Sequence, residues 1–470
     1  MTELNLVGGM PAEEFRKAGH EVIDWIAGYL AGIRDYPVLP SVQPGDVAAK
    51  LPAAAPEKGE SIEAILEDFR GIILPGVTHW NHPGFHGYFA ISGSGPGILA
   101  ESLVAALNVN AMLWKTCPSA TELEQVVLGW LREWVGLPEG FFGIVYDTAS
   151  ISTTHAIAAA REQAAPESRQ TGTPAGLVMY CSEQAHNSVD KAAIALGIGH
   201  RNLRKIPVDE AFRMRPEALR QRIAQDLADG KKPFCVVATT GTTSTTSIDP
   251  VPAIADIAEE HGLWLHIDGA YGGPAAIVPE YRHVLEGAGR ADSIVINPHK
   301  WLFTQTDFSA FYTRRPEVLR RAFSLAAEYL KTSEDSRAVN LMDYGLQLGR
   351  RFRALKFWFV LRYFGHEGVI GILRSHIGWA REFASWVEAD PSFELAAPVP
   401  LALVCFRYRG SNEQNQMLLD RVNASGHALL SHTVLNGRFV LRMAIGNIAT
   451  THVDIESLWS LIREKAAGLE

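Results

Sequence analysis

The sequence predicts an α/β protein in which a mostly parallel central sheet is covered by helices on both faces. Short apolar runs, rich in β-branched or aromatic residues, recur through the middle of the 470-residue chain, and helical stretches separate several of them. Near-continuous apolar strands are typical of parallel sheets, since both faces of such a sheet are buried. The alternation of strands with helices favours the same class.

The elements of this sheet can be placed along the chain. The predicted strands are residues 176–181, 234–240, 263–270, 292–298 and 308–314, and two predicted helices between them are 216–229 and 251–261. Ligands of such sheets bind at the carboxyl ends of the strands. The residues that directly follow each strand are therefore the candidates for chemistry.

The N-terminal region is predicted to be a helical arm. Apolar residues recur at helical spacing within 12–34, a proline-rich extended stretch covers 36–56, and a second helix is expected at 61–73. Such an arm buries little surface by itself. We therefore expect it to pack on another lobe or on another subunit.

The last part of the chain changes character. Helices are predicted at 352–364 and 453–465, and strands at 401–409 and 437–445. A chain of this length is expected to form more than one domain. We expect an N-terminal helical arm over 1–90, a large sheet domain over 91–355 and a small C-terminal α+β domain over 356–470.

Composition argues against several classes of protein. The formal charge is 43 − 52 = −9, which gives no reason to expect nucleic acid or an anionic membrane as a partner. No run of 18 apolar residues and no secretory signal is present, so no membrane span is expected. The cysteines form no CxxC pair, which favours reduced thiols in a cytoplasm over a zinc knuckle or a disulfide framework. They are Cys117, Cys181, Cys235 and Cys405.

Two charged residues end predicted strands. Asp268 lies in LHIDGAY at 265–271, and Lys300 lies in INPHKWL at 296–302. A carboxylate in an apolar strand is costly unless it meets a cation. Judged singly, Asp268 could cap a loop and Lys300 could be a solvated lysine after a turn. Because the two residues end strands about one βα unit apart, we expect them to face one ligand from opposite sides.

Polar turns follow other predicted strands. YDTASISTTHAIAAAR at 146–161 places small hydroxylated residues at the start of a helix, where backbone N–H groups bind phosphate. TTGTTSTTS at 239–247 is a second hydroxyl-rich turn, and His186 lies at a third. Each signal is weak alone, because Ser and Thr are ordinary N-caps.

Together these residues supply a lysine for an imine, an acid for a heterocyclic nitrogen, a phosphate cradle and an aromatic side chain. That set fits pyridoxal phosphate. A metal site built from His266, Asp268 and His299 is the alternative. It lacks an HExxH-type pair and leaves the lysine unexplained, so we expect no metal.

The motifs around these residues carry a resemblance to a known family. They are HIDGAY, NPHKWL, SEQAHNSVDKA at 182–192, LGRRFRALKFWFVLR at 348–362 and SATELE at 119–124. From about Phe15 to near the C-terminus, the chain resembles the group II pyridoxal-phosphate decarboxylases, and most of all their aromatic-L-amino-acid branch. The resemblance implies fold type I of the pyridoxal-phosphate-dependent transferases. It also implies a homodimer whose active sites form at the subunit interface.

The resemblance also implies roles for single residues. Lys300 would form the imine with the cofactor, and Asp268 would hold the pyridine nitrogen protonated. His186 would stack on one face of the ring and Ala270 would pack on the other. Tyr329 matches a loop tyrosine that delivers a proton, assisted by His186. The other matched cofactor-binding residues are Thr148, Ala149, Ser150, Thr243, Asn297 and His299.

The matched substrate pocket is aromatic. Ile91 stands where a catechol-handling member of the family has threonine. Gly349 matches the smaller option at a position where plant tyrosine decarboxylases carry serine. Both residues favour an indole or phenyl ring over that of DOPA. The matched pocket residues are Trp80, Tyr88, Phe89, Ile91, Gly349 and, from the neighbouring subunit, Met112.

The phosphate turn departs from the family pattern at Asp147 and Ile151. Hydroxyl and backbone donors remain in the turn. Asp147, however, is expected to bring a negative charge close to the phosphate.

The predicted function is decarboxylation of an aromatic L-amino acid, tryptophan or phenylalanine-like, to the amine and CO2. An aromatic aldehyde synthase is a first alternative, although such enzymes typically replace the loop tyrosine with phenylalanine or the stacking histidine with asparagine. A decarboxylase of a non-aromatic amino acid is a second, and an acidic substrate would need a cation in the pocket. A cofactor-free scaffold is a third, and it should not retain Lys300 and Asp268.

Overall fold

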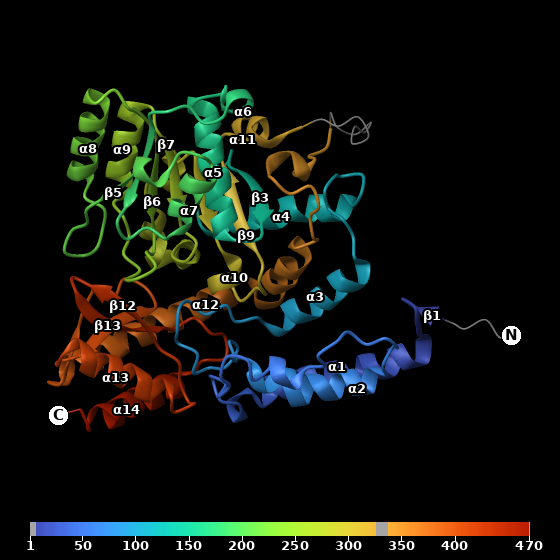
Figure 1. Cartoon of the computed structure of the whole chain (residues 1–470). Helices are drawn as coiled ribbons and strands as arrows, with labels where there is room; N and C mark the ends of the chain where they lie inside the picture. Colours follow the sequence, from blue (N-terminus) through green and yellow to red (C-terminus); the bar gives the residue numbers. More distant parts are fainter. Residues whose placement is uncertain (1–5, 326–336, 470) are drawn as a thin grey trace.

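The computed structural model describes residues 6–325 and 337–469, arranged around a central sheet (Figure 1). Within this part of the chain, seven strands form the sheet in the order β3-β9-β8-β7-β6-β4-β5. Neighbouring strands from β5 to β8 run parallel, whereas β9 is antiparallel to both of its neighbours. The strands are β3 (Phe142–Tyr146), β4 (Leu177–Ser182), β5 (Leu203–Ile206), β6 (Lys232–Thr239), β7 (Trp264–Asp268), β8 (Ser293–Ile296) and β9 (Ser309–Thr313).

Helices cover both faces of this sheet, as the fold class predicts. Successive side chains of a strand point to opposite faces, and Val236 and Val237 of β6 belong to two separate apolar clusters. The Val237 cluster includes residues of α5 (Ala149–Ala164), α7 (Ser188–Ala195) and α11 (Pro316–Phe323). The Val236 cluster includes residues of α8 (Pro216–Ala228), α9 (Val251–His261) and α12 (Ala354–Ala389).

The C-terminal part packs a second sheet against helices. Its strand order is β10-β11-β13-β12, and all of its pairings are antiparallel. The long helix α12 leads into it and bends at Gly365, whose φ of 65° interrupts the helix. The elements are β10 (Phe393–Leu395), β11 (Leu403–Tyr408), α13 (Asn412–Asn423), β12 (Ser431–Leu435), β13 (Arg438–Ala444) and α14 (His452–Ala466).

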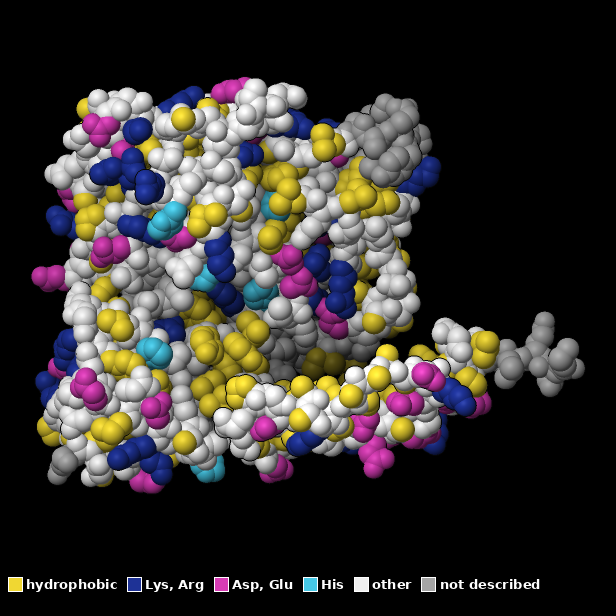
Figure 2. Space-filling view, viewed as in Figure 1, with side chains coloured by type: hydrophobic (Ala, Val, Ile, Leu, Met, Phe, Trp, Pro, Cys, Tyr) yellow, Lys and Arg dark blue, Asp and Glu magenta, His cyan; other side chains and the backbone are white. Residues whose placement is uncertain are grey.

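The N-terminal helices form an arm that extends beneath the body of the molecule (Figure 1). Helix α1 has no buried residue, and apolar side chains such as Phe15 and Ile23 are exposed. Leu99, Leu103 and Leu107 of α3 are also exposed. Figure 2 shows apolar side chains gathered along the arm. The helices and strands that precede the central sheet in the sequence are β1 (Leu6–Val7), β2 (Met10–Pro11), α1 (Ala12–Ala31), α2 (Ile62–Asp68), α3 (Gly95–Leu107) and α4 (Pro118–Trp134).

None of the helices in the described ranges is both long enough and apolar enough to cross a membrane. The three proposed parts of the chain, divided near residues 90 and 355, stay a prediction.

Candidate active site

A cavity of about 170 Å³ lies at the carboxyl ends of the central strands, where the fold class predicts a ligand site. It is bordered by the ends of β6 and β7, by the turn after β8 and by the N-terminus of α5. Its lining residues are Phe89, Thr148, Ala149, Ser150, His186, Thr239, Gly241, Thr243, Asp268, Ala270, Tyr271, Asn297, His299 and Lys300.

Lys300 lies in the single-turn helix α10 (Pro298–Trp301), directly after β8. Its amine is 5.4 Å from the centroid of the Phe89 ring. Within the described residues, no hydrogen bond or ion pair holds this amine. Burial lowers the pKa of Lys300, and the Asp268 carboxylate partly opposes that shift. A buried amine that loses its proton readily is suited to attack a carbonyl carbon.

Asp268 is the last residue of β7 and is 6 % exposed. One of its oxygens, Oδ1, accepts a hydrogen bond from the Ala270 N–H at 3.1 Å. The turn thus fixes the carboxylate in the cavity wall, where a protonated ring nitrogen would compensate its charge.

His186 lies in the turn between β4 and α7. Its Nδ1 accepts a hydrogen bond from the Ser188 N–H at 3.1 Å. Burial lowers the pKa of His186, so the neutral ring prevails at neutral pH, and its proton is on Nε2. The imidazole can therefore donate one hydrogen bond from Nε2.

The start of α5 forms an anion-binding end of the cavity. Thr148 is its N-cap residue, and the Thr148 carbonyl already accepts from the N–H groups of Ile151 and Ser152. The N–H groups of Ala149 and Ser150 remain at the first turn, where the helix dipole favours a negative charge. Both of these residues line the cavity.

The structure gives Asp147 a different role from the one expected of a charge beside a phosphate. Its Oδ1 accepts from the Thr148 N–H at 2.5 Å and from Thr148 Oγ1 at 3.1 Å. Its Oδ2 accepts from Gln347 Nε2 at 3.0 Å. Asp147 is not among the cavity-lining residues, and its carboxylate links the Thr148 turn to Gln347.

Asp147→Ala is expected to weaken cofactor binding about fivefold, because losing a capping acceptor typically costs about 1 kcal/mol. Asp147→Asn keeps one oxygen for the Thr148 N–H and should stay within about twofold of the parent. Equilibrium dialysis against graded cofactor concentrations measures both. A tightening of about tenfold or more in Asp147→Asn would instead show that the carboxylate repels the phosphate.

His299 and Asn297 complete the far side of the cavity. His299 Nδ1 accepts from the Phe308 N–H at 2.9 Å, and its Nε2 lies 3.2 Å from the Asn297 side-chain nitrogen. Burial and the Lys300 charge lower the pKa of His299 to about 3, so this ring is neutral. Asn297 Oδ1 and Thr239 Oγ1 are buried and have no hydrogen-bond partner within the described residues.

These residues fit pyridoxal phosphate. The helix start would hold the phosphate, the unpaired lysine would hold the aldehyde carbon, and the carboxylate would face the pyridinium nitrogen. The unpartnered hydroxyl oxygen of Thr239 leaves a polar group available in the same region. In the alternative metal set, His266 instead bonds to Ser293 Oγ through Nδ1 at 2.9 Å and does not line the cavity.

The predicted substrate residues are only partly brought together. Phe89 lines the cavity, and Trp80 stacks on Tyr88 with ring centroids 5.8 Å apart. The other predicted pocket residues are not among those that line the cavity in the described part of the chain: Trp80, Tyr88, Ile91, Met112 and Gly349. The predicted proton donor, Tyr329, lies outside the described residues.

Three further lining residues lie within segments that the sequence marks as candidates, but were not predicted individually: Tyr271, Thr239 and Gly241. Tyr271 stacks on Phe89 with ring centroids 3.7 Å apart. The strand-end rule could have found Tyr271, which comes three residues after Asp268. Gly241 has a φ of 93°, and a Cβ there would lie 2.8 Å from the Gly272 nitrogen, so the turn requires glycine.

Comparison of the sequence with models of known protein families shows which family has this site. The model of the pyridoxal-dependent decarboxylase conserved domain matches residues 44–409. The chain belongs to the pyridoxal-dependent decarboxylases. It is therefore an enzyme that uses pyridoxal phosphate to decarboxylate an amino acid, and the predicted family, fold type and cofactor are confirmed.

Relatives of this decarboxylase cover its full length. It is 42% identical to an aromatic-L-amino-acid decarboxylase of Bos taurus, over 97% of each chain. It is 40% identical to a phenylacetaldehyde synthase of Arabidopsis thaliana, over 98% of this chain and 97% of that one. A crystal structure of Catharanthus roseus tryptophan decarboxylase in complex with L-tryptophan superposes with a TM-score of 0.92 at 37% identity, covering 98% of this chain and 99% of that one.

Proposed function

We propose that this decarboxylase converts an aromatic L-amino acid to its amine and CO2. The observation that carries the proposal is the Phe89 ring, which lies beside the Lys300 amine and stacks on Tyr271 in the cavity wall. Such stacked rings favour an aromatic substrate side chain. The names of the relatives support the same substrate class.

Each of the main residues of the cavity is proposed to have its own role in the reaction. Pyridoxal phosphate, when bound, withdraws the electrons that the departing carboxylate leaves behind. Asp268 would hold the pyridine nitrogen protonated, Lys300 would hold the cofactor between turnovers, and Ala270 would pack against it. His186 would lie against the cofactor from the other side, and its Nε2–H would be available for proton transfer together with Tyr329.

The ring of the substrate is proposed to be an indole or a plain phenyl group rather than a catechol. The proposal rests on the match of Ile91 and Gly349 to pocket positions of the family: Ile91 offers no hydrogen bond to a ring hydroxyl, and Gly349 is the smaller residue of its position. Parallel assays with tryptophan, phenylalanine, tyrosine and DOPA, with glutamate as a non-aromatic control, test this order. A higher kcat/KM for DOPA or glutamate than for tryptophan and phenylalanine would contradict it.

An aldehyde synthase is the second candidate, because the phenylacetaldehyde synthase is 40% identical over nearly the whole chain. His186 and Tyr329 are both present here, and this favours the amine. Amine, aldehyde, ammonia and peroxide should be measured in the same reactions. Aldehyde and peroxide formed in equal amounts, without amine, would decide for the synthase.

Tyr329→Phe is expected to shift the product from amine towards aldehyde, because the proposed donor of the proton to the substrate carbon is removed. The ratio of amine to aldehyde, measured by chromatography, reports the shift. His186→Asn should move the ratio in the same direction. An unchanged ratio and rate in Tyr329→Phe would remove the tyrosine from the mechanism.

We propose further that the enzyme is a cytoplasmic homodimer, with Met112 reaching the partner's pocket. The exposed apolar side chains of α1 and α3 support an interface there, because contiguous exposed apolar surface commonly marks a contact. The four cysteines are unpaired, as a reducing cytoplasm requires. A monomeric mass in solution, from light scattering, would contradict the dimer.

A further inference from the structure

Arg442 is a buried cation that is held by neutral acceptors. It lies on β13 and is 4 % exposed. Its guanidinium donates to the Thr243 carbonyl at 2.6 Å, to the Ser244 carbonyl at 3.0 Å and to Ser431 Oγ at 2.7 Å. Within residues 6–325 and 337–469, no carboxylate forms an ion pair with it. Burying a charge without a counter-ion is costly, so packing alone does not explain an arginine here.

The contacts of Arg442 reach two segments of the active-site cavity. Thr243 lines the cavity, and two hydrogen bonds of the guanidinium fix the carbonyls of the 243–244 turn. The guanidinium carbon also lies 5.5 Å from the centroid of the Phe89 ring, which forms another part of the lining. One side chain of the C-terminal sheet therefore touches both segments.

Ser431 links Arg442 to Tyr88, the residue before Phe89. Its hydroxyl oxygen accepts from Arg442 at 2.7 Å and from the Tyr88 N–H at 3.1 Å. Tyr88 has a φ of 53°, a left-handed conformation that bulky residues seldom adopt. Such a conformation persists only when neighbouring groups stabilise it. The hydrogen bond from the Tyr88 N–H to Ser431, which Arg442 also contacts, is one such contact.

Two further strands of the C-terminal sheet meet the same turn. The Cys405 thiol of β11 donates to the Ser244 carbonyl at 3.1 Å, and Thr433 Oγ1 of β12 lies 3.1 Å from Ser244 Oγ. These are single, weaker contacts. Arg442 alone among these side chains also contacts Phe89.

We propose that Arg442 is a positioning residue through which the C-terminal sheet sets the Tyr88–Phe89 segment and the Thr243–Ser244 turn around the cofactor and the substrate ring. The planar guanidinium satisfies three acceptors at once, which a lysine amine on the same stem does not reproduce. The proposal rests on the assignment of this cavity to the cofactor and the aromatic substrate.

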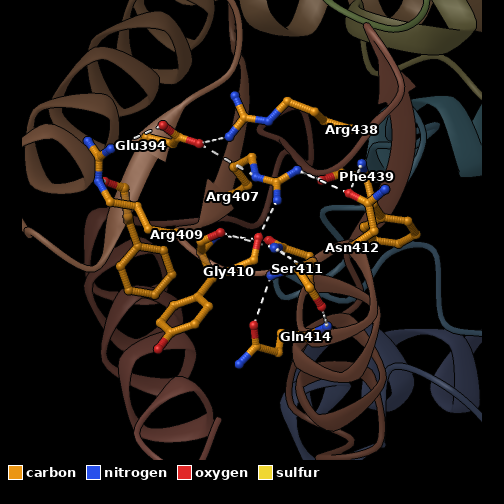
Figure 3. Close-up of polar contacts among 12 residues, drawn as sticks. Glu394, Arg407, Arg409, Gly410, Ser411, Asn412, Gln414, Arg438 and Phe439 are labelled. Carbon is orange, nitrogen blue, oxygen red and sulfur yellow. Dashed lines mark hydrogen bonds and ion pairs between the residues drawn. The ribbon is translucent and has the colours of Figure 1, made fainter. Parts of the chain in front are cut away.

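The same sheet offers a matched control in Arg407 of β11, which is 3 % exposed. Its guanidinium donates to the Phe439 carbonyl at 3.0 Å and the Gly410 carbonyl at 2.6 Å, and lies 3.6 Å from Glu394 (Figure 3). All of these partners belong to the C-terminal part of the chain. Arg407 is thus a buried arginine of the same sheet that does not contact the cavity lining.

The test compares Arg442→Met with Arg407→Met. Both variants are expected to melt at lower temperature than the parent. Only Arg442→Met should raise the cofactor dissociation constant, by about tenfold or more, and raise KM with a smaller change in kcat, because the lost contacts position both ligands. Equilibrium dialysis of the holoenzyme against graded pyridoxal phosphate and steady-state kinetics give these values. Arg442→Lys, which keeps the charge, should recover only part of the affinity.

A cofactor dissociation constant and a KM within about twofold of the parent in Arg442→Met would overturn the proposal, as would an equal rise of both in Arg407→Met. If Arg442→Met does not fold, Ser431→Ala serves instead, since it removes one acceptor and the bond to Tyr88. It should raise KM about three- to fivefold, and an unchanged KM would overturn the proposal. Failure of the proposed function is distinct: the parent enzyme itself would then bind cofactor without releasing CO2 from any aromatic amino acid.

Discussion

Lys300→Ala is expected to reduce turnover by about a thousandfold or more while the protein stays folded. The lysine is the one amine in the cavity lining, so its loss removes the covalent hold on the cofactor. The absorbance of the lysine-bound cofactor should disappear. Stability should change little, because removal of a buried amine, whose pKa burial already lowers, relieves a desolvation cost that offsets the lost packing.

Lys356 provides a matched control, because burial lowers the pKa of this lysine as well, but its amine pairs with Glu101. Lys356→Met should lower the melting temperature and retain the absorbance of the bound cofactor. The measurements are an absorbance spectrum, a thermal melt and amine production. A Lys300→Ala enzyme that makes amine at the parent rate would refute the assignment of the catalytic lysine.

The free energy of unfolding is expected to fall by roughly 9 kcal/mol between pH 7 and pH 5. Five buried histidines have their pKa lowered by burial, to about 4 or about 3 in the folded state. Their pKa in an unfolded chain is about 6.5, so the unfolded state binds more protons as the pH falls. Each residue then costs about 2 kcal/mol over this range. They are His86, His155, His266, His299 and His376.

The sign of this effect follows from the direction of each shift. For the five histidines, stability is fully present above pH 6.5 and is lost as the pH falls towards the folded-state pKa values. Asp249 acts in the opposite direction, because burial raises its pKa to about 6, and it offsets only about 1 kcal/mol. Urea titrations followed by tryptophan fluorescence at several pH values measure the slope.

His376→Gln removes one of these groups and should reduce the slope of unfolding free energy against pH by about 1.4 kcal/mol per pH unit. A parent protein whose unfolding free energy is the same at pH 7 and pH 5 would contradict the account of neutral buried histidines.

Much of the fold was predictable because apolar strands and intervening helices leave a strong local pattern. The helix at 251–261 matches α9, and the strands β4, β6, β7, β8 and β9 all fall where apolar runs were found. The strand β5 was missed because its four residues, LRKI, are half polar. The antiparallel direction of β9 could not be predicted, since direction depends on tertiary contacts rather than on the run itself.

The candidate site was predictable to the extent that it follows strand ends. Asp268, Lys300 and His186 could be predicted because each lies in or just after a predicted strand. The structure shows that all three line one cavity. The hydrogen bond from Gln347 to Asp147, which supports the Thr148 turn, could not be predicted, because it joins residues 200 positions apart in the sequence. The reach of Arg442 into the 243–244 turn was missed for the same reason, since β13 belongs to the other sheet.

The insertion of β9 between β8 and β3 sets the order in which the site can be assembled during synthesis. Strand β3, which precedes the start of α5 that we propose binds the phosphate, pairs with no described strand except β9. Strand β3 and the start of α5 therefore have no edge of the sheet to join until residue 313 has left the ribosome. Nascent chains stalled before that point should not retain pyridoxal phosphate, although they already contain Lys300 and Asp268. The growing chain therefore contains the Lys300 amine before it contains β9, the strand that β3 needs as its partner in the sheet.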